Sequence, residues 1–94
     1  MNDRDNSRAR RKAVALRYQA ESDAAPRIVA KGAGYLADRI LDLARRHGVS
    51  IHEDRDLVEV LSKLDVDTPI PESLYRAVAE VLAFVYRLNR RQAE

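Results

Sequence analysis

The spacing of apolar residues changes at Gly32-Ala33-Gly34, and this change limits the folds that the chain can adopt. Before the glycines, the apolar side chains of residues 13–18 recur with a period of two, which predicts a strand. After the glycines, apolar residues recur at helical spacing. A chain that passes from strand spacing to helical spacing at one turn is predicted to fold as an α/β domain.

Two further short strands are predicted, at residues 27–31 and at residues 49–52. The first of these lies directly before the glycines, and the other follows the expected helix. A strand, a helix and a strand with short joints imply a right-handed parallel crossover. We therefore expect a small mixed sheet of about three strands.

Three helices are expected to pack with this sheet, and the last of them is long. The first spans residues 35–47 and ends at Gly48, which suits the left-handed position after a helix. Asp54 or Asp56 caps the second helix, and Pro71 fits the first turn of the last helix, where no amide hydrogen is needed. The side chains expected to face the core are Leu36, Ile40, Leu43 and Ala44 in the first helix, Leu57, Val60, Leu61 and Leu64 in the second, and Leu74, Val78, Val81, Val85 and Leu88 in the last.

Length and composition exclude several classes of protein. The 94 residues suffice for one small domain, which we divide into a disordered basic tail (1–12) and a folded domain (13–91). The chain has no Cys, which excludes a disulfide framework and a thiolate metal site. No apolar run is long enough to span a bilayer, and the first residues lack the apolar core of a signal peptide. The expected compartment is the cytoplasm.

The basic residues gather at the two ends of the chain. The formal net charge is only +2, which by itself does not indicate a nucleic-acid partner. Basic ends can nevertheless attract phosphates or an anionic membrane surface. A basic-ended adaptor for nucleic acid or anionic lipid therefore stays open as one alternative function.

The segment Gly32-Ala33-Gly34-Tyr35-Leu36-Ala37 fits the pattern G-x-G-x-x-A between a strand and a helix, and Glu53 follows about 20 residues later. In dinucleotide-binding domains, such a turn holds pyrophosphate and the acidic residue binds the ribose. A dinucleotide needs two βαβ halves, however, and this chain has room for one. The glycines are also explained as turn residues that let a strand meet a helix closely. A small nucleotide-binding βαβ module using Gly32-Ala33-Gly34 is the other alternative.

No constellation of residues predicts catalysis. His47 and His52 are the only imidazoles, and they form no helical i, i+4 pair for a metal ion. The serines lie in no nucleophile-elbow pattern. We therefore expect no enzyme activity, no cofactor and no metal site.

Three ordered blocks resemble a known family. They are Ala13 to Tyr18 (AVALRY), Ala25 to Gly34 (APRIVAKGAG) and Pro71 to Tyr86 (PESLYRAVAEVLAFVY). In these blocks the chain is similar to the C-terminal cytoplasmic domain of the FlhB and YscU type of type III secretion export switch protein. The resemblance implies a bacterial protein with a role in flagellar biosynthesis or type III protein export. In this family, the domain docks export substrates and switches the class of substrate that is accepted.

The chain departs from this family at the cleavage motif. Family members cleave themselves at Asn-Pro-Thr-His just before the first block, where the Asn side chain attacks its own carbonyl and breaks the bond to Pro. The matching positions here are Arg8, Ala9, Arg10 and Arg11, and no Asn of this chain precedes a Pro. We therefore expect a free-standing, non-catalytic FlhB-like homologue that resembles the post-cleavage fragment and cannot cleave itself.

Two consequences of the resemblance concern partners. The family's first strand has no counterpart here, which would expose a sheet edge beside residues 13–18 where a partner strand can add. Glu59 stands where the family often has a cation, and this reversed charge can change which partner docks. The expected partners are type III export-gate proteins and export substrates at the inner face of the membrane-bound apparatus, with no nucleic acid. The candidate partner-binding residues are Arg10, Arg11, Lys12, Arg55, Asp56 and Glu59.

Overall fold

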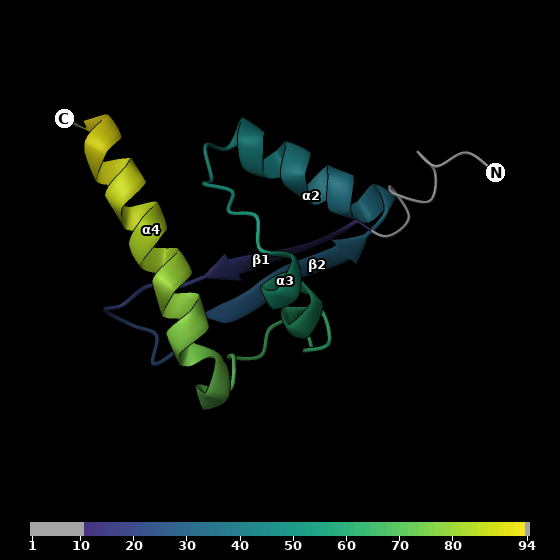
Figure 1. The fold of residues 1–94 in the computed structure, drawn as a ribbon, viewed down its shortest axis with the longest axis horizontal. Helices are drawn as coiled ribbons and strands as arrows, with labels where there is room; N and C mark the ends of the chain where they lie inside the picture. Colours follow the sequence, from purple (N-terminus) through teal and green to yellow (C-terminus); the bar gives the residue numbers. More distant parts are fainter. Residues whose placement is uncertain (1–10, 94) are drawn as a thin grey trace.

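The protein places its helices on both faces of a two-stranded sheet (Figure 1). Its computed structural model describes the backbone of residues 11–93 and the side chains of residues 11–87. The class is α/β, as predicted. The elements are β1 (Lys12–Arg17), β2 (Arg27–Ala33), α2 (Tyr35–Arg46), α3 (Arg55–Leu61), the 3₁₀ turn η1 (Glu72–Leu74) and α4 (Tyr75–Ala93).

The two strands are antiparallel. Lys12 lies opposite Ala33, and Arg17 lies opposite Arg27, with a bulge after Ala15 where the register shifts. A later segment, residues 67–70, covers the start of the other edge of β2. There the Ile28 N–H donates to the Thr68 carbonyl at 3.3 Å, and the Ile70 N–H donates to the Pro26 carbonyl at 2.9 Å. A mixed sheet would contain both parallel and antiparallel strand pairs. The one strand pair in the described residues is antiparallel, so the prediction of a mixed sheet is wrong.

Residues 49–52 form no strand, so the predicted third strand and the parallel crossover are also wrong. The alternation that suggested a strand is real, but it leaves Val49 58% exposed and Ile51 38% exposed. A strand forms only beside a neighbour that pairs with its backbone groups. No described strand lies beside residues 49–52 to pair with their backbone groups.

The first helix follows the prediction closely at both ends. Gly34 adopts a φ of +61° directly before α2, and Gly48 adopts a φ of +68° after it. Both conformations lie in the region that favours glycine. Gly32 serves a different purpose, because a Cβ atom there would lie 2.6 Å from the Leu36 Cβ. Its missing side chain lets the start of α2 approach β2.

The buried face of α2 differs from the prediction. Ala37 is fully buried, whereas Leu36 is 62% exposed and Leu43 is 42% exposed. The expected core residues Ile40 and Ala44 are half-buried. The close approach at Gly32 selects a small side chain for the contact, and a sheet of two strands is too narrow to cover the flank of the helix that carries Leu36 and Leu43.

The main core lies between the sheet, α3 and α4. Val14 and Leu16 pack against it from β1. Val60 of α3 is 43% exposed, so its predicted burial is wrong. The residues that form the buried cluster are Ile28, Leu61, Ile70 and Val78.

The last helix begins later than predicted. Pro71 precedes η1, and this turn leads directly into α4. Val78 is fully buried, as predicted, and Leu74 is half-buried within η1. The predicted core residues Val81 and Val85 are half-buried, and the side chain of Leu88 lies outside the described residues. Within residues 11–93, no helix has the length and apolar character that a membrane crossing requires.

Candidate partner-binding surface

The predicted partner-binding residues do not form one continuous patch of unpaired charges. Arg8, Ala9 and Arg10 lie outside the described residues. Of the others, Lys12 and Glu59 bind each other, and Arg11 binds a residue of α2. Two of the predicted residues, Arg55 and Asp56, remain exposed on the first turn of α3.

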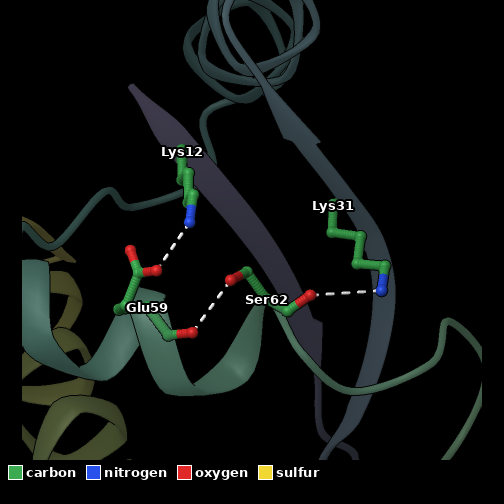
Figure 2. Close-up of polar contacts among 4 residues, drawn as sticks. All are labelled: Lys12, Lys31, Glu59 and Ser62. Carbon is green, nitrogen blue, oxygen red and sulfur yellow. Dashed lines mark hydrogen bonds and ion pairs between the residues drawn. The ribbon is translucent and has the colours of Figure 1, made fainter. Parts of the chain in front are cut away.

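The Lys12–Glu59 ion pair joins the start of β1 to α3 (Figure 2). The Lys12 Nζ lies 2.6 Å from the Glu59 Oε1, and both side chains are partly exposed. The hydrogen bond from Lys12, together with its positive charge, lowers the pKa of Glu59 below its ordinary value of 4.5. The negative charge of Glu59, which stands where the family often has a cation, is thus paired with Lys12 within the chain.

Arg11 is also engaged within the chain. Its guanidinium forms an ion pair with the carboxylate of Asp38 in the first turn of α2. The Gly34 N–H donates to the Arg11 carbonyl at 2.8 Å, which continues the ladder of the sheet. Arg11 therefore connects the segment before β1 to α2 through its side chain and to Gly34 through its backbone. Its role in partner binding stays a prediction.

The exposed start of α3 is built around Asp54. Its Oδ1 accepts a hydrogen bond from the Leu57 N–H at 3.0 Å, so Asp54 is the cap, one of the two candidates that the sequence offered. Asp56 in the first turn is favoured by the helix dipole. Within the part of the chain that the structure describes, Arg55 and Asp56 make no side-chain hydrogen bond or ion pair, which leaves opposite charges side by side in solvent.

Sequence reasoning missed the role of Lys31. This half-buried side chain extends from β2, and its Nζ donates to the Ser62 carbonyl at 3.2 Å (Figure 2). The same Nζ donates to the Leu64 carbonyl at 2.6 Å. These carbonyls follow the last turn of α3, where backbone acceptors lack helical partners. The available signal was a lysine directly after the apolar residues Ile28, Val29 and Ala30 of the predicted strand. Lysines from both strands thus hold α3 against the sheet.

The glycine motif does not build a nucleotide site of the expected kind. The sheet is antiparallel and residues 49–52 form no strand, so the βαβ unit on which that interpretation depended is absent from the described residues. Glu53 is exposed in the segment before α3. Gly32 is accounted for by its contact with Leu36.

The two histidines are far from metal-binding geometry. His47 caps the end of α2, and the His52 ring packs against Phe84 of α4 with a centroid distance of 5.3 Å. Among the described residues, no group of three or more His, Cys, Asp or Glu side chains is placed to hold a metal ion. No catalytic constellation emerges from the described geometry.

Comparisons with known sequences match most of the chain to one family. The sequence model of the FlhB, HrpN, YscU and SpaS family matches residues 10–85. The protein YlqH of Bacillus subtilis is 52% identical over 79 residues, which span 84% of this chain and 85% of YlqH. The flagellar biosynthetic protein FlhB of Bacillus subtilis is 39% identical over 84% of this chain, but the match spans only 22% of that protein. The chain thus spans about a fifth of the FlhB relative.

Solved structures give the same result. The cytoplasmic domain of FlhB from Shewanella putrefaciens superposes with a TM-score of 0.83 and 35% identity, covering 87% of this chain and 68% of that domain. The C-terminal domain of PscU superposes with a TM-score of 0.75 and 30% identity, covering 78% of this chain and 94% of that domain.

Proposed function

The chain belongs to the FlhB, HrpN, YscU and SpaS family, and from this premise we propose that it is a non-catalytic docking module of a flagellar or type III protein export apparatus. The single observation that carries the proposal is the likeness to the FlhB cytoplasmic domain of Shewanella putrefaciens, which extends over 87% of the chain. The proposed site of action is the cytoplasm, at the inner face of the membrane-bound apparatus. The proposed partners are export-gate proteins and export substrates.

The proposed module resembles the post-cleavage state of the family and does not cleave itself. The family's reaction needs an Asn side-chain amide beside the carbonyl that precedes a Pro. At the matching positions this chain has Arg8 to Arg11, and Asn2, Asn6 and Asn89 are followed by residues other than Pro. Without that amide nucleophile, the peptide bonds at these positions have no side chain that could attack them as in the family's reaction. The chain would therefore hold one docking state permanently.

The exposed start of α3 supports a docking role. Arg55 and Asp56 are solvated, and no internal ion pair in the described residues would have to break before a partner could bind them. Charges at the rim of an interface affect the association rate and the choice of partner more than the affinity. A partner surface with opposite charges at both positions would fit this pair.

The proposal is tested by recovering partners with the tagged full-length protein from a lysate of export-competent cells and identifying them by mass spectrometry. An R55E/D56R variant runs beside it. The matched control is R76E/E80R, which reverses an exposed ion pair on α4 whose atoms lie 3.8 Å apart. We expect export-gate proteins or export substrates to be recovered by the unaltered protein and by the α4 control, and to be reduced with R55E/D56R.

Two results would contradict the proposal at different levels. Recovery of neither export-gate proteins nor export substrates would remove the export role. Equal recovery with R55E/D56R and with the unaltered protein would keep the export role and remove the start of α3 as its docking surface.

A further inference from the structure

One side of α2 is left largely exposed by the described part of the chain. Leu36 is 62% exposed and Leu43 is 42% exposed. The two leucines are seven residues apart, so they lie in line along one side of the helix. In Figure 1, α2 runs along one border of the molecule. We call this side the outer face of α2.

Charged residues accompany these two leucines. Arg39 lies between them, three residues after Leu36 and four residues before Leu43. It is exposed, and its side chain makes no hydrogen bond or ion pair with the residues that the structure describes. Asp42 and Arg46 pair with each other at 3.1 Å, and their side chains are 55% and 72% exposed. The residues of the outer face are Tyr35, Leu36, Arg39, Asp42, Leu43 and Arg46.

The order of these residues is complementary to its own reverse. When two copies of α2 lie antiparallel, Leu36 of one copy lies near Leu43 of the other. In the same arrangement, Arg39 of each copy lies near Asp42 of the other, and opposite charges across a contact fix its register. Parallel helices would instead set Arg39 beside Arg39. The charge pattern therefore favours the antiparallel arrangement.

The two ends of the outer face match in the same way. Tyr35 is 75% exposed at the start of α2, and Arg46 is exposed at its end. An antiparallel pair brings these two side chains together, and a guanidinium can bind the face of an aromatic ring. All of these pairs are centred close to Ile40, so one two-fold axis generates each contact twice. A second copy of the chain thus supplies every group that the outer face requires.

We propose that two copies of the chain associate through the outer faces of their α2 helices, which lie antiparallel about a two-fold axis. The contact along a helix of 12 residues is smaller than the roughly 1,200 Å² that stable complexes bury, so the dimer dissociates on dilution. The inference does not depend on the proposed export role. It also uses none of the residues at the start of α3.

Sedimentation equilibrium of the purified full-length protein tests the proposal, at concentrations from about 10 µM to about 1 mM. The average mass should rise with concentration from 10.7 kDa toward twice that value. Arg45→Asp is the matched control, because helical spacing places the exposed Arg45 on a different flank of the same helix. This control should associate as strongly as the unaltered protein.

Reversal of single charges should weaken the contact. In a pair of Arg39→Asp chains, the introduced aspartate meets Asp42 twice, and in a pair of Asp42→Arg chains the introduced arginine meets Arg39 twice. Each variant alone should therefore associate about tenfold or more weakly than the unaltered protein. An equimolar mixture of the two variants should regain the association, since opposite charges then meet at both positions. Circular dichroism checks that each variant is folded.

The chain has no Cys, so introduced cysteines report the orientation of the helices. A mixture of Leu36→Cys and Leu43→Cys should form a disulfide-linked dimer of the two variants under mild oxidation. This linkage should be faster than the linkage of either variant with itself. Faster linkage of one variant with itself would indicate parallel helices and would contradict the proposal.

Two further results would overturn the proposal. A constant mass of 10.7 kDa up to the highest concentration would exclude the dimer and leave the outer face to a different protein. Association that Arg39→Asp does not weaken, or that the mixture does not restore, would place the contact on another surface. Because only the purified chain is used, each result is independent of whether the protein associates with the export apparatus.

Discussion

The two faces of the sheet are packed in different ways. On the face toward α3 and α4, Ile28 and Val78 are fully buried within an aliphatic core. On the face toward α2, the fully buried residue is Ala37, and Leu36 remains largely exposed. The first face is held by burial of large side chains, whereas the second depends on close approach at Gly32 and on the Arg11–Asp38 ion pair. The stability of the domain therefore resides mainly on the α3–α4 face.

The largest expected difference is in the free energy of unfolding, between truncation of an isoleucine on one face and of a leucine on the other. Ile28→Ala should lower the free energy of unfolding by about 2–5 kcal/mol, because it leaves a cavity in the core. Leu36→Ala should change it by less than about 0.5 kcal/mol, because this side chain is mostly in solvent. Urea denaturation followed by circular dichroism measures both values. Similar losses for the two variants would mean that the faces contribute equally.

The contact between β2 and α2 is tested by Gly32→Ala. The added Cβ would lie 2.6 Å from the Leu36 Cβ and 3.1 Å from the Leu36 carbonyl carbon, so the helix must move. We expect a loss of about 1–3 kcal/mol in the free energy of unfolding. Gly48→Ala is the control, since its Cβ meets no atom within 4 Å and only its φ of +68° opposes the change. A loss no greater than at Gly48 would show that α2 accommodates the methyl group by a small shift.

The attachment of α3 is tested by Lys31→Met. This change keeps much of the aliphatic stem and removes the donor for the Ser62 and Leu64 carbonyls. We expect the free energy of unfolding to fall by about 1–2 kcal/mol. Lys63→Met, on the exposed surface, is the matched control and should have no measurable effect. Amide exchange of residues after α3 should accelerate in the first variant alone.

The smallest expected effect concerns the Lys12–Glu59 pair. The pKa of Glu59 is lowered in the folded protein, so ionised Glu59 stabilises the fold above pH 4.5. This contribution disappears as the pH falls through the lowered pKa. Glu59→Gln should therefore reduce thermal stability slightly at neutral pH and not at all in strong acid. Added salt should shrink the neutral-pH difference, because the pair is partly exposed. A difference that grows on acidification would contradict the assignment of the pair.

Several features of the protein follow from short stretches of sequence. Both glycines that bound α2, the Asp54 cap and the alternation in residues 13–18 depend on neighbouring residues, and the structure confirms each of them. The three blocks that resemble the FlhB and YscU type also indicate the family, and the family match over residues 10–85 confirms it. The domain boundaries and the partner-binding role of the charged residues stay predictions.

Other features were decided by tertiary structure. Residues 49–52 have the alternation of a strand and form none, because no described strand offers its backbone to them. The exposure of Leu36 and the burial of Ala37 follow from how closely α2 approaches β2. The partner of Lys12 lies 47 residues away in sequence. Local spacing indicated β1, β2 and α2, since it reflects the preferences of adjacent residues. Strand pairing, burial and ion pairs depend on which distant segments meet.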